Sequence, residues 1–252
     1  MRISPCIALL LAPFVATGLR ADTLTIAVAS NFAQPAHVLA ALYEKSSGHD
    51  VRITSASTGK LYAQIKNGAP FDLFLAADSE RPRLLEDSGS GVAGSRFTYA
   101  LGELVLWSAD ADLEGQDCLG QLENLGDRKL AIANPLTAPY GVAAREALQA
   151  SGVWEAVQEN LVYGENISQT LHFVASRNAA LGLIATSQSQ DVRLPEPSCS
   201  WPVPPALHGS IEQQAILLAR AADNDVAEDF LRYLRSSLAI DIIAAHGYKV
   251  VR

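Results

Sequence analysis

Apolar and polar positions follow one another along this chain in a repeated order: an apolar stretch, a stop of small polar residues, and an amphipathic helix. The stops are residues 29–31, 57–59, 138–141 and 166–168. The first backbone N–H groups of a helix have no partner inside it and carry partial positive charge. Each stop is therefore a half-site for an anion, and four of them can converge on one small ligand.

The same pattern predicts two α/β units. In the first we expect strands at 24–29, 51–55 and 71–76, and helices at 32–46, 61–67 and 79–88. In the second we expect strands at 130–133, near Leu161 and at 181–185, and helices at 141–150 and 168–177. Residues 110–127 are polar and are expected to form loops.

Two strands, 103–107 and 213–218, are expected to cross between the units, and helices at 224–235 and 238–246 return to the first. Residues 194–205 hold five of the twelve prolines and are predicted to be a loop. The expected division is lobe 1 at residues 22–103 plus 214–252, and lobe 2 at 104–213. Ligands of such folds bind at the carboxyl ends of the strands, where all four stops fall.

The first 21 residues have the layout of a secretory signal peptide: Arg2, an apolar run at residues 7–15, and small residues ending at Ala21. We expect cleavage after Ala21, with Ala16 and Gly18 marking another possible site. Removal takes away Arg2 and Arg20, leaving 17 basic and 27 acidic residues and a net charge of −10. The mature protein is expected to be an exported, acidic monomer, and its charge argues against nucleic-acid binding.

Two cysteines, Cys118 and Cys199, follow the signal segment. Export would place them where a disulfide persists, so a disulfide and two buried free thiols are the alternatives.

Several motifs are similar to those of the periplasmic molybdate-binding proteins of ABC importers. They are AVASNF at 27–32, SASTGKLYAQI at 55–65, NGAPFDLFLAAD at 67–78, and NP at 134–135 followed by APYG at 138–141. The resemblance spans essentially the whole mature chain. It implies a type II periplasmic binding protein fold, with molybdate or tungstate held between two lobes and delivered to a membrane permease.

The resemblance also implies which residues bind the oxyanion: Ser30, Asn31, Thr58, Tyr140 and Ile167, with Ser57 as a possible substitute for Thr58. Many members have Leu at the position of Asn31 and Ser at that of Thr58. Ile167 would contribute its backbone N–H. Some relatives place a tyrosine hydroxyl near the position of Thr186. This chain has no tyrosine there, so Tyr140 is expected to supply that hydroxyl.

Each of these residues also has a purely structural interpretation. Ser30, Asn31, Thr58 and Ser168 are good helix N-caps, Tyr140 can be a packed aromatic, and Ile167 a core residue. Lys60 is expected either to add positive potential or to be a solvated surface residue. Glu165 and Asp72 are expected to be structural or solvent-facing.

The residues expected to bind the oxyanion are all hydrogen-bond donors, and this favours a fully deprotonated anion. Molybdate at neutral pH is a dianion with no proton to donate, so hydrogen-bond donors alone satisfy it, whereas hydrogenphosphate also needs an acceptor. Molybdenum would be bound as its oxyanion, without direct metal ligands and without any cofactor. Sulfate has the same charge and is smaller, so a sulfate-binding protein is the nearer alternative.

The sequence contains no signature of an enzyme. The five histidines lack metal-ligand spacing, and there is no Gly-x-Ser-x-Gly elbow, phosphate-binding loop or Cys-x-x-Cys motif. We therefore expect a binding protein, with a periplasmic hydrolase as the remote alternative.

Overall fold

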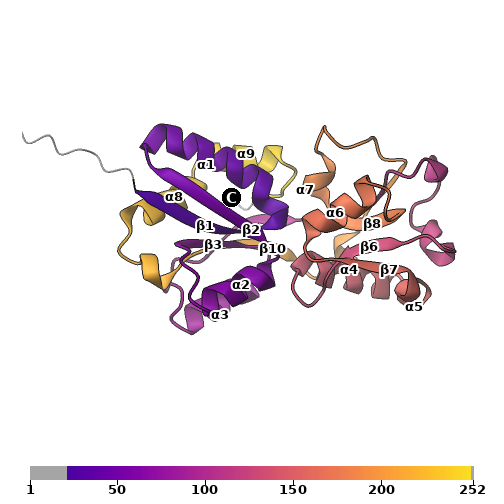
Figure 1. Cartoon of the computed structure of the whole chain (residues 1–252), viewed down its shortest axis with the longest axis horizontal. Helices are drawn as coiled ribbons and strands as arrows, with labels where there is room; N and C mark the ends of the chain where they lie inside the picture. Colours follow the sequence, from indigo (N-terminus) through magenta and orange to yellow (C-terminus); the bar gives the residue numbers. More distant parts are fainter. Residues whose placement is uncertain (1–21, 251–252) are drawn as a thin grey trace, which may run out of the picture.

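A computed structural model describes residues 22–250, which form two α/β lobes lying side by side along the longest axis of the molecule (Figure 1). The expected two-lobe α/β architecture is confirmed. The predicted signal peptide lies outside the described residues. Within residues 22–250 no helix has the length and apolar character needed to cross a membrane.

The sheet of lobe 1 has the strand order β2-β1-β3-β10-β4. Strands β1, β2 and β3 are parallel, and β10 runs antiparallel to both β3 and β4. The strands are β1 Thr23–Ala29, β2 Asp50–Ala56, β3 Leu73–Ala76, β4 Phe97–Gly102 and β10 Ile211–Leu217.

Helices cover both faces of this sheet (Figure 1). Alternate residues of β1 point to opposite faces: Ile26 packs with the cluster that includes α1, α8 and α9, and Ala27 with the cluster that includes α2 and α3. The helices are α1 Ala33–Ser47, α2 Thr58–Lys66, α3 Glu80–Asp87, α8 Asp225–Leu234 and α9 Ser237–Ala245.

Lobe 2 repeats this plan with the strand order β7-β6-β8-β5-β9. Its three parallel strands, β6, β7 and β8, are followed by β5, which is antiparallel to β8 and β9. The elements are β5 Leu104–Ser108, β6 Leu130–Ala133, β7 Leu161–Gly164, β8 Leu181–Ala185, β9 Cys199–Pro202, α4 Pro139–Ala150, α5 Trp154–Val157, α6 Ile167–Ala175 and α7 Thr186–Ser189.

Two strands were not foreseen from the sequence. The proline-rich segment contains β9, so the prediction of a loop over 194–205 is wrong at residues 199–202. Strand β9 lies at the edge of its sheet, where Pro202 removes no hydrogen bond that a second neighbouring strand would need. Strand β4 is likewise an edge strand, and its alternation is short and only partly buried.

The lobes are joined by the connection from β4 to β5 and by the return from β9 to β10. Residues 211–213 fall on the lobe 2 side of the boundary expected from the sequence, yet they pair with β4 in the sheet of lobe 1. The pairing of β10 with β4 shifts register between Gln213 and Gln214, because Tyr99 is an extra residue on β4. This is a β-bulge, a feature that redirects side chains.

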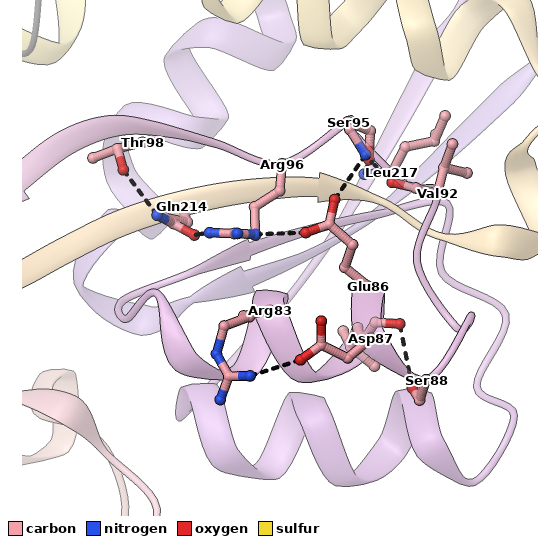
Figure 2. Close-up of polar contacts among 12 residues, drawn as sticks. Arg83, Glu86, Asp87, Ser88, Val92, Ser95, Arg96, Thr98, Gln214 and Leu217 are labelled. Carbon is pink, nitrogen blue, oxygen red and sulfur yellow. Dashed lines mark hydrogen bonds and ion pairs between the residues drawn. The ribbon is translucent and has the colours of Figure 1, made fainter.

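Polar contacts hold β10 on the face of its sheet that packs against α3 (Figure 2). The side chain of Arg96 lies between Glu86 of α3 and Gln214 of β10, at 3.0 Å and 2.9 Å. Gln214 in turn donates to the hydroxyl of Thr98 at 2.9 Å. Of the two successive glutamines at the bulge, Gln214 therefore belongs to this network.

In lobe 2 a disulfide joins Cys118 to Cys199, with the two Cα atoms 5.5 Å apart. Of the two alternatives for these cysteines, the structure has the disulfide. It ties the irregular segment after β5 to the edge strand β9.

Candidate functional site

The four polar stops meet where the two lobes face each other. The short 3-10 helix η1 (Ser30–Phe32) and α2 begin in lobe 1, and α4 and α6 begin in lobe 2. One cluster of buried side chains joins them, since it contains Ala29 and Ala77 of lobe 1 together with Tyr140 and Ile167 of lobe 2. The helix starts therefore converge across the lobe boundary.

Direct bonds between the lobes hold this arrangement closed. The hydroxyl of Ser168 donates to the carbonyl oxygen of Ser30 at 3.1 Å. The backbone N–H of Gly59 donates to the carbonyl oxygen of Thr137 at 2.8 Å, and Lys60 forms an ion pair with Glu165. In this structure the helix starts thus face one another with little solvent between them.

All of the residues predicted to bind the oxyanion are buried, namely Ser30, Asn31, Ser57, Thr58, Tyr140 and Ile167. The structural interpretation of the polar ones as N-caps does not hold. The N-cap of η1 is Ala29, that of α1 is Phe32 and that of α6 is Asn166. None of Ser30, Asn31, Thr58 and Ser168 is itself an N-cap in the structure.

The start of α2 presents two neighbouring hydroxyls with different surroundings. Ser57 is the N-cap residue of α2, but its side chain makes no capping bond, and its buried Oγ has no hydrogen-bond partner within residues 22–250. The Oγ1 of Thr58 accepts from the backbone N–H of Ala77 at 3.1 Å. That bond leaves the hydroxyl proton of Thr58 free to be donated.

Asn31 lies against lobe 1 with its side-chain amide fully used. Its Nδ2 donates to Oε1 of Gln213 at 2.8 Å and to the phenol oxygen of Tyr248 at 2.9 Å. The phenol of Tyr248 donates to the backbone carbonyl of Asn31 at 2.8 Å. An amide group has two N–H donors, so both are satisfied inside the protein here.

Tyr140 is 1 % exposed, and its hydroxyl has no hydrogen-bond partner in the described part of the chain. Burial holds the pKa of this phenol well above its ordinary value, so it stays protonated and remains a donor. A buried, unpaired hydroxyl costs free energy, about 1–3 kcal/mol. Ser57 at the start of α2 has a buried hydroxyl in the same condition.

At the start of α6, Asn166 is the cap. Its Oδ1 accepts from the backbone N–H groups of Ser168 and Gln169, both at 3.0 Å. The side chain of Asn166 does not accept a hydrogen bond from the backbone N–H of Ile167, the first residue of the helix. The role expected of Ile167, donation from the backbone, is compatible with this geometry.

The carboxylates near the motifs have other partners. Asp72 is buried and accepts from the backbone N–H of Thr25 at 2.7 Å, and it also pairs with Arg220. Glu165 is exposed and paired with Lys60. Asp72 is therefore structural and Glu165 solvent-facing, as expected, and Lys60 spans the lobe boundary rather than standing alone in solvent.

A cavity of about 180 Å³ opens beside the helix starts. Ser30 and Asn31 line it from lobe 1, and Ser168 and Gln188 line it from lobe 2. Thr58, Tyr140 and Ile167 are not among its lining residues. Across residues 22–250 no group of three or more His, Cys, Asp or Glu side chains is arranged to hold a metal ion.

Two residues at the site were missed from the sequence, Gln213 and Tyr248. They lie 182 and 217 positions from Asn31, so no local motif connects them to it. Asn166 was included in a polar stop, but Ser168 was preferred as the cap. The Asn-x-Ser spacing was the available signal, because asparagine is at least as good an N-cap as serine.

Comparison with known proteins agrees with this geometry. Residues 24–249 match the model of the bacterial extracellular solute-binding protein family. The chain is 44% identical to the molybdate-binding protein ModA of Azotobacter vinelandii, over 94% of each chain, and 43% identical to that of Rhodobacter capsulatus, over 88% of this chain and 86% of the other.

The fold is also similar to a solved structure of the Azotobacter vinelandii periplasmic molybdate-binding protein. The TM-score is 0.84 at 36% sequence identity, covering 91% of this chain and 100% of that one. The match extends over both lobes and all four helix starts. The chain therefore belongs to the ModA family of bacterial extracellular solute-binding proteins.

Proposed function

We propose that this protein captures molybdate between its two lobes in the periplasm and delivers it to an ABC permease, with tungstate as a second ligand. The observation that carries the proposal is the unpartnered hydroxyl of Tyr140, buried where four helix starts meet. The family relationship supports the choice of oxyanion, because relatives at 44% and 43% identity are molybdate-binding proteins.

We assign the ligand contacts as follows. The hydroxyls of Thr58 and Tyr140 donate from side chains, and the turn at Ser30 and Asn31 and the start of α6 at Ile167 donate from the backbone. Ser57 is a further candidate, since its buried hydroxyl is also unpartnered. All these groups are donors, which suits an anion that carries no proton, and the nearby carboxylates are engaged elsewhere.

The lobe boundary also supports a closing motion. Ser30, Asn31 and Thr58 come from lobe 1, whereas Tyr140 and Ile167 come from lobe 2, so only the closed form brings all the donors to one anion. The ligand then favours closure through its higher affinity for that form. We place the hinge at the two connections between the lobes, near residue 103 between β4 and β5, and at residues 203–210 between β9 and β10.

The remaining expectations belong to the same proposal. The signal peptide at residues 1–21 would direct export, the binding protein would act as a monomer, and it would have no catalytic activity. A substrate-hydrolysis screen separates this from the remote hydrolase alternative, because a binding protein gives saturable ligand shifts without turnover.

A thermal-shift panel of molybdate, tungstate, sulfate, phosphate and chromate tests the ligand. A ligand at 100 times its dissociation constant stabilises the folded state by about 2.7 kcal/mol. We expect large shifts with molybdate and tungstate and a small one with phosphate. Equal shifts from sulfate and molybdate would favour the sulfate-binding alternative and contradict the proposed specificity.

A further inference from the structure

A buried polar cluster lies directly behind the candidate site and comes from three distant parts of the chain. It consists of Asn31 in η1, Gln213 in β10 and Tyr248 after α9, all less than 5 % exposed. Among the described residues it links the anion-facing turn to the strand that returns from lobe 2. We name it the Asn31 clamp.

The clamp fixes both the side chain and the backbone of Asn31. The amide donates to Gln213 and Tyr248, and the carbonyl oxygen accepts from the same Tyr248 phenol. Both amide hydrogens are therefore turned away from an incoming anion. What the turn can offer from position 31 is its backbone N–H, held in place by the clamp.

Gln213 also lies close to Tyr140, the proposed donor of lobe 2. A Cβ atom placed on Gly102 would lie 2.2 Å from the phenol oxygen of Tyr140 and 3.0 Å from Nε2 of Gln213. The two side chains thus converge over the same backbone, at the end of β4 where the chain crosses into lobe 2. Any residue larger than glycine at position 102 would displace one of them.

Gln213 reaches this position because successive residues of β10 point to opposite faces of the sheet. Gln214 is held on the far side by Arg96 and Thr98 (Figure 2). The next residue back, Gln213, points the other way, toward Asn31. The extra residue of the bulge, Tyr99, packs its ring against Phe32 at 4.7 Å between centroids, directly after the turn.

We propose that Gln213 and Tyr248 are positioning residues for oxyanion binding: they hold the 30–31 turn in its donating conformation without contacting the anion. The inference rests on the proposed function, because it concerns the same site. It assigns part of the affinity to the returning strand and to the segment after α9, which the binding motifs do not include.

The test compares two adjacent glutamines in the full mature chain. In Gln213→Met the amide of Asn31 loses an acceptor, the 30–31 turn loses part of its support, and the dissociation constant for molybdate should rise about tenfold. Gln214→Met is the matched control, since it breaks the contacts with Arg96 and Thr98 on the far side. It should lower the melting temperature and leave the dissociation constant within about twofold.

Tyrosine variants form a second matched pair. Tyr248→Phe keeps the ring packed against Phe32, at 5.4 Å between centroids, but removes the hydroxyl that holds Asn31. It should weaken binding by about fivefold or more. Tyr233→Phe removes a buried hydroxyl without a partner elsewhere in lobe 1 and should leave binding unchanged.

A rescue experiment separates positioning from plain damage. Replacing both partners of a hydrogen bond by apolar groups is close to neutral, whereas replacing one is not. The double variant Asn31→Leu with Gln213→Met should therefore bind molybdate more tightly than Gln213→Met alone. Isothermal titration well below each melting temperature gives the dissociation constants.

The outcomes distinguish the two proposals. If the parent binds molybdate and Gln213→Met binds equally well, or loses no more affinity than Gln214→Met, the positioning role is overturned and the proposed function stands. If the parent binds sulfate instead, the same variants are titrated with sulfate and decide the positioning role there. If the parent binds no oxyanion, both proposals fail.

Discussion

The two lobes share one plan but hold their donors differently. Each sheet has three parallel strands followed by an antiparallel crossing strand and an antiparallel edge strand. In lobe 1, Asn31 and Thr58 are each fixed by hydrogen bonds from other elements. In lobe 2, the hydroxyl of Tyr140 has no hydrogen-bond partner among residues 22–250. Lobe 1 thus holds Asn31 and Thr58 in place while leaving Ser57 Oγ unpaired, and the proposed side-chain donor of lobe 2 is not held by any such bond.

The hydrophobic cores of the two lobes are also supported in different ways. Beneath the turn of lobe 1, Phe32 packs against Tyr99 and Tyr248, with centroids 4.7 Å and 5.4 Å away. Lobe 2 has a larger share of irregular chain between β5 and β6 and secures it with the disulfide Cys118–Cys199. A rigid aromatic core supports lobe 1, whereas a covalent link supports lobe 2.

The stabilities of the two lobes should differ most at alkaline pH. Burial raises the pKa of Tyr99 and Tyr248 in lobe 1, and of Tyr140 in lobe 2. Unfolded phenols ionise near pH 10, so the stability these groups contribute is fully present below about pH 10 and is lost as the pH rises through the folded pKa values. Burial also raises the pKa of Tyr43 and Tyr233, so lobe 1 has four such tyrosines and should open first, as followed by tyrosinate absorbance with circular dichroism. Earlier loss of lobe 2 would contradict this.

Removal of the disulfide should have the next largest effect, confined to lobe 2. The double variant Cys118→Ala with Cys199→Ala should lose about 2–5 kcal/mol of unfolding free energy, because the link closes a long loop of the unfolded chain. Urea denaturation measures the loss, and reductant should destabilise the parent but not the variant. Molybdate affinity at low temperature should be nearly unchanged. An equal stability for parent and variant would sink the contrast between the two cores.

Thr58→Val should weaken molybdate binding by about 1.5–3 kcal/mol, roughly ten- to a hundredfold. The substitution keeps the shape but removes the proposed donor to the anion, and it also takes away the acceptor of the Ala77 N–H. Ser57→Ala is the neighbouring control. If Ser57→Ala loses affinity and Thr58→Val does not, the ligand contact belongs to Ser57.

Tyr140→Phe should have a smaller effect on affinity, about tenfold, with an opposite effect on stability. The parent keeps an unpaired buried hydroxyl that phenylalanine lacks, so the ligand-free variant should be as stable as the parent or more stable. Titration and thermal melts of the ligand-free proteins measure both. A variant that loses both affinity and stability would show that the hydroxyl has a structural partner instead.

Most of the fold was predictable because its signals are local. The strands β1, β6 and β8 are short apolar runs bounded by polar stops, and their expected positions agree with the structure to within a residue. The edge strands β4 and β9 were missed because edge positions tolerate proline and partial exposure, which weakens the pattern. Their pairing depends on partners distant in sequence.

The candidate site divides along the same line. Ser30, Thr58 and Tyr140 stand inside motifs at helix starts, so the sequence indicates them, and all three are buried at the lobe boundary. Gln213 and Tyr248 act through Asn31 from remote segments, and a side-chain contact over about two hundred positions leaves no local signal. The use of both amide hydrogens of Asn31 inside the protein was unforeseen for the same reason.

The place of β10 between β3 and β4 has a consequence for the order in which the molecule folds. Lobe 2 is one continuous stretch of chain, whereas β3 and β4 of lobe 1 have no strand between them until residues 211–217 are available. Loop closure over so long a stretch is slow compared with local pairing. Hydrogen-exchange labelling during refolding should therefore find lobe 2 protected first. The strand that carries Gln213 would then complete the sheet and the anion site in a single late step.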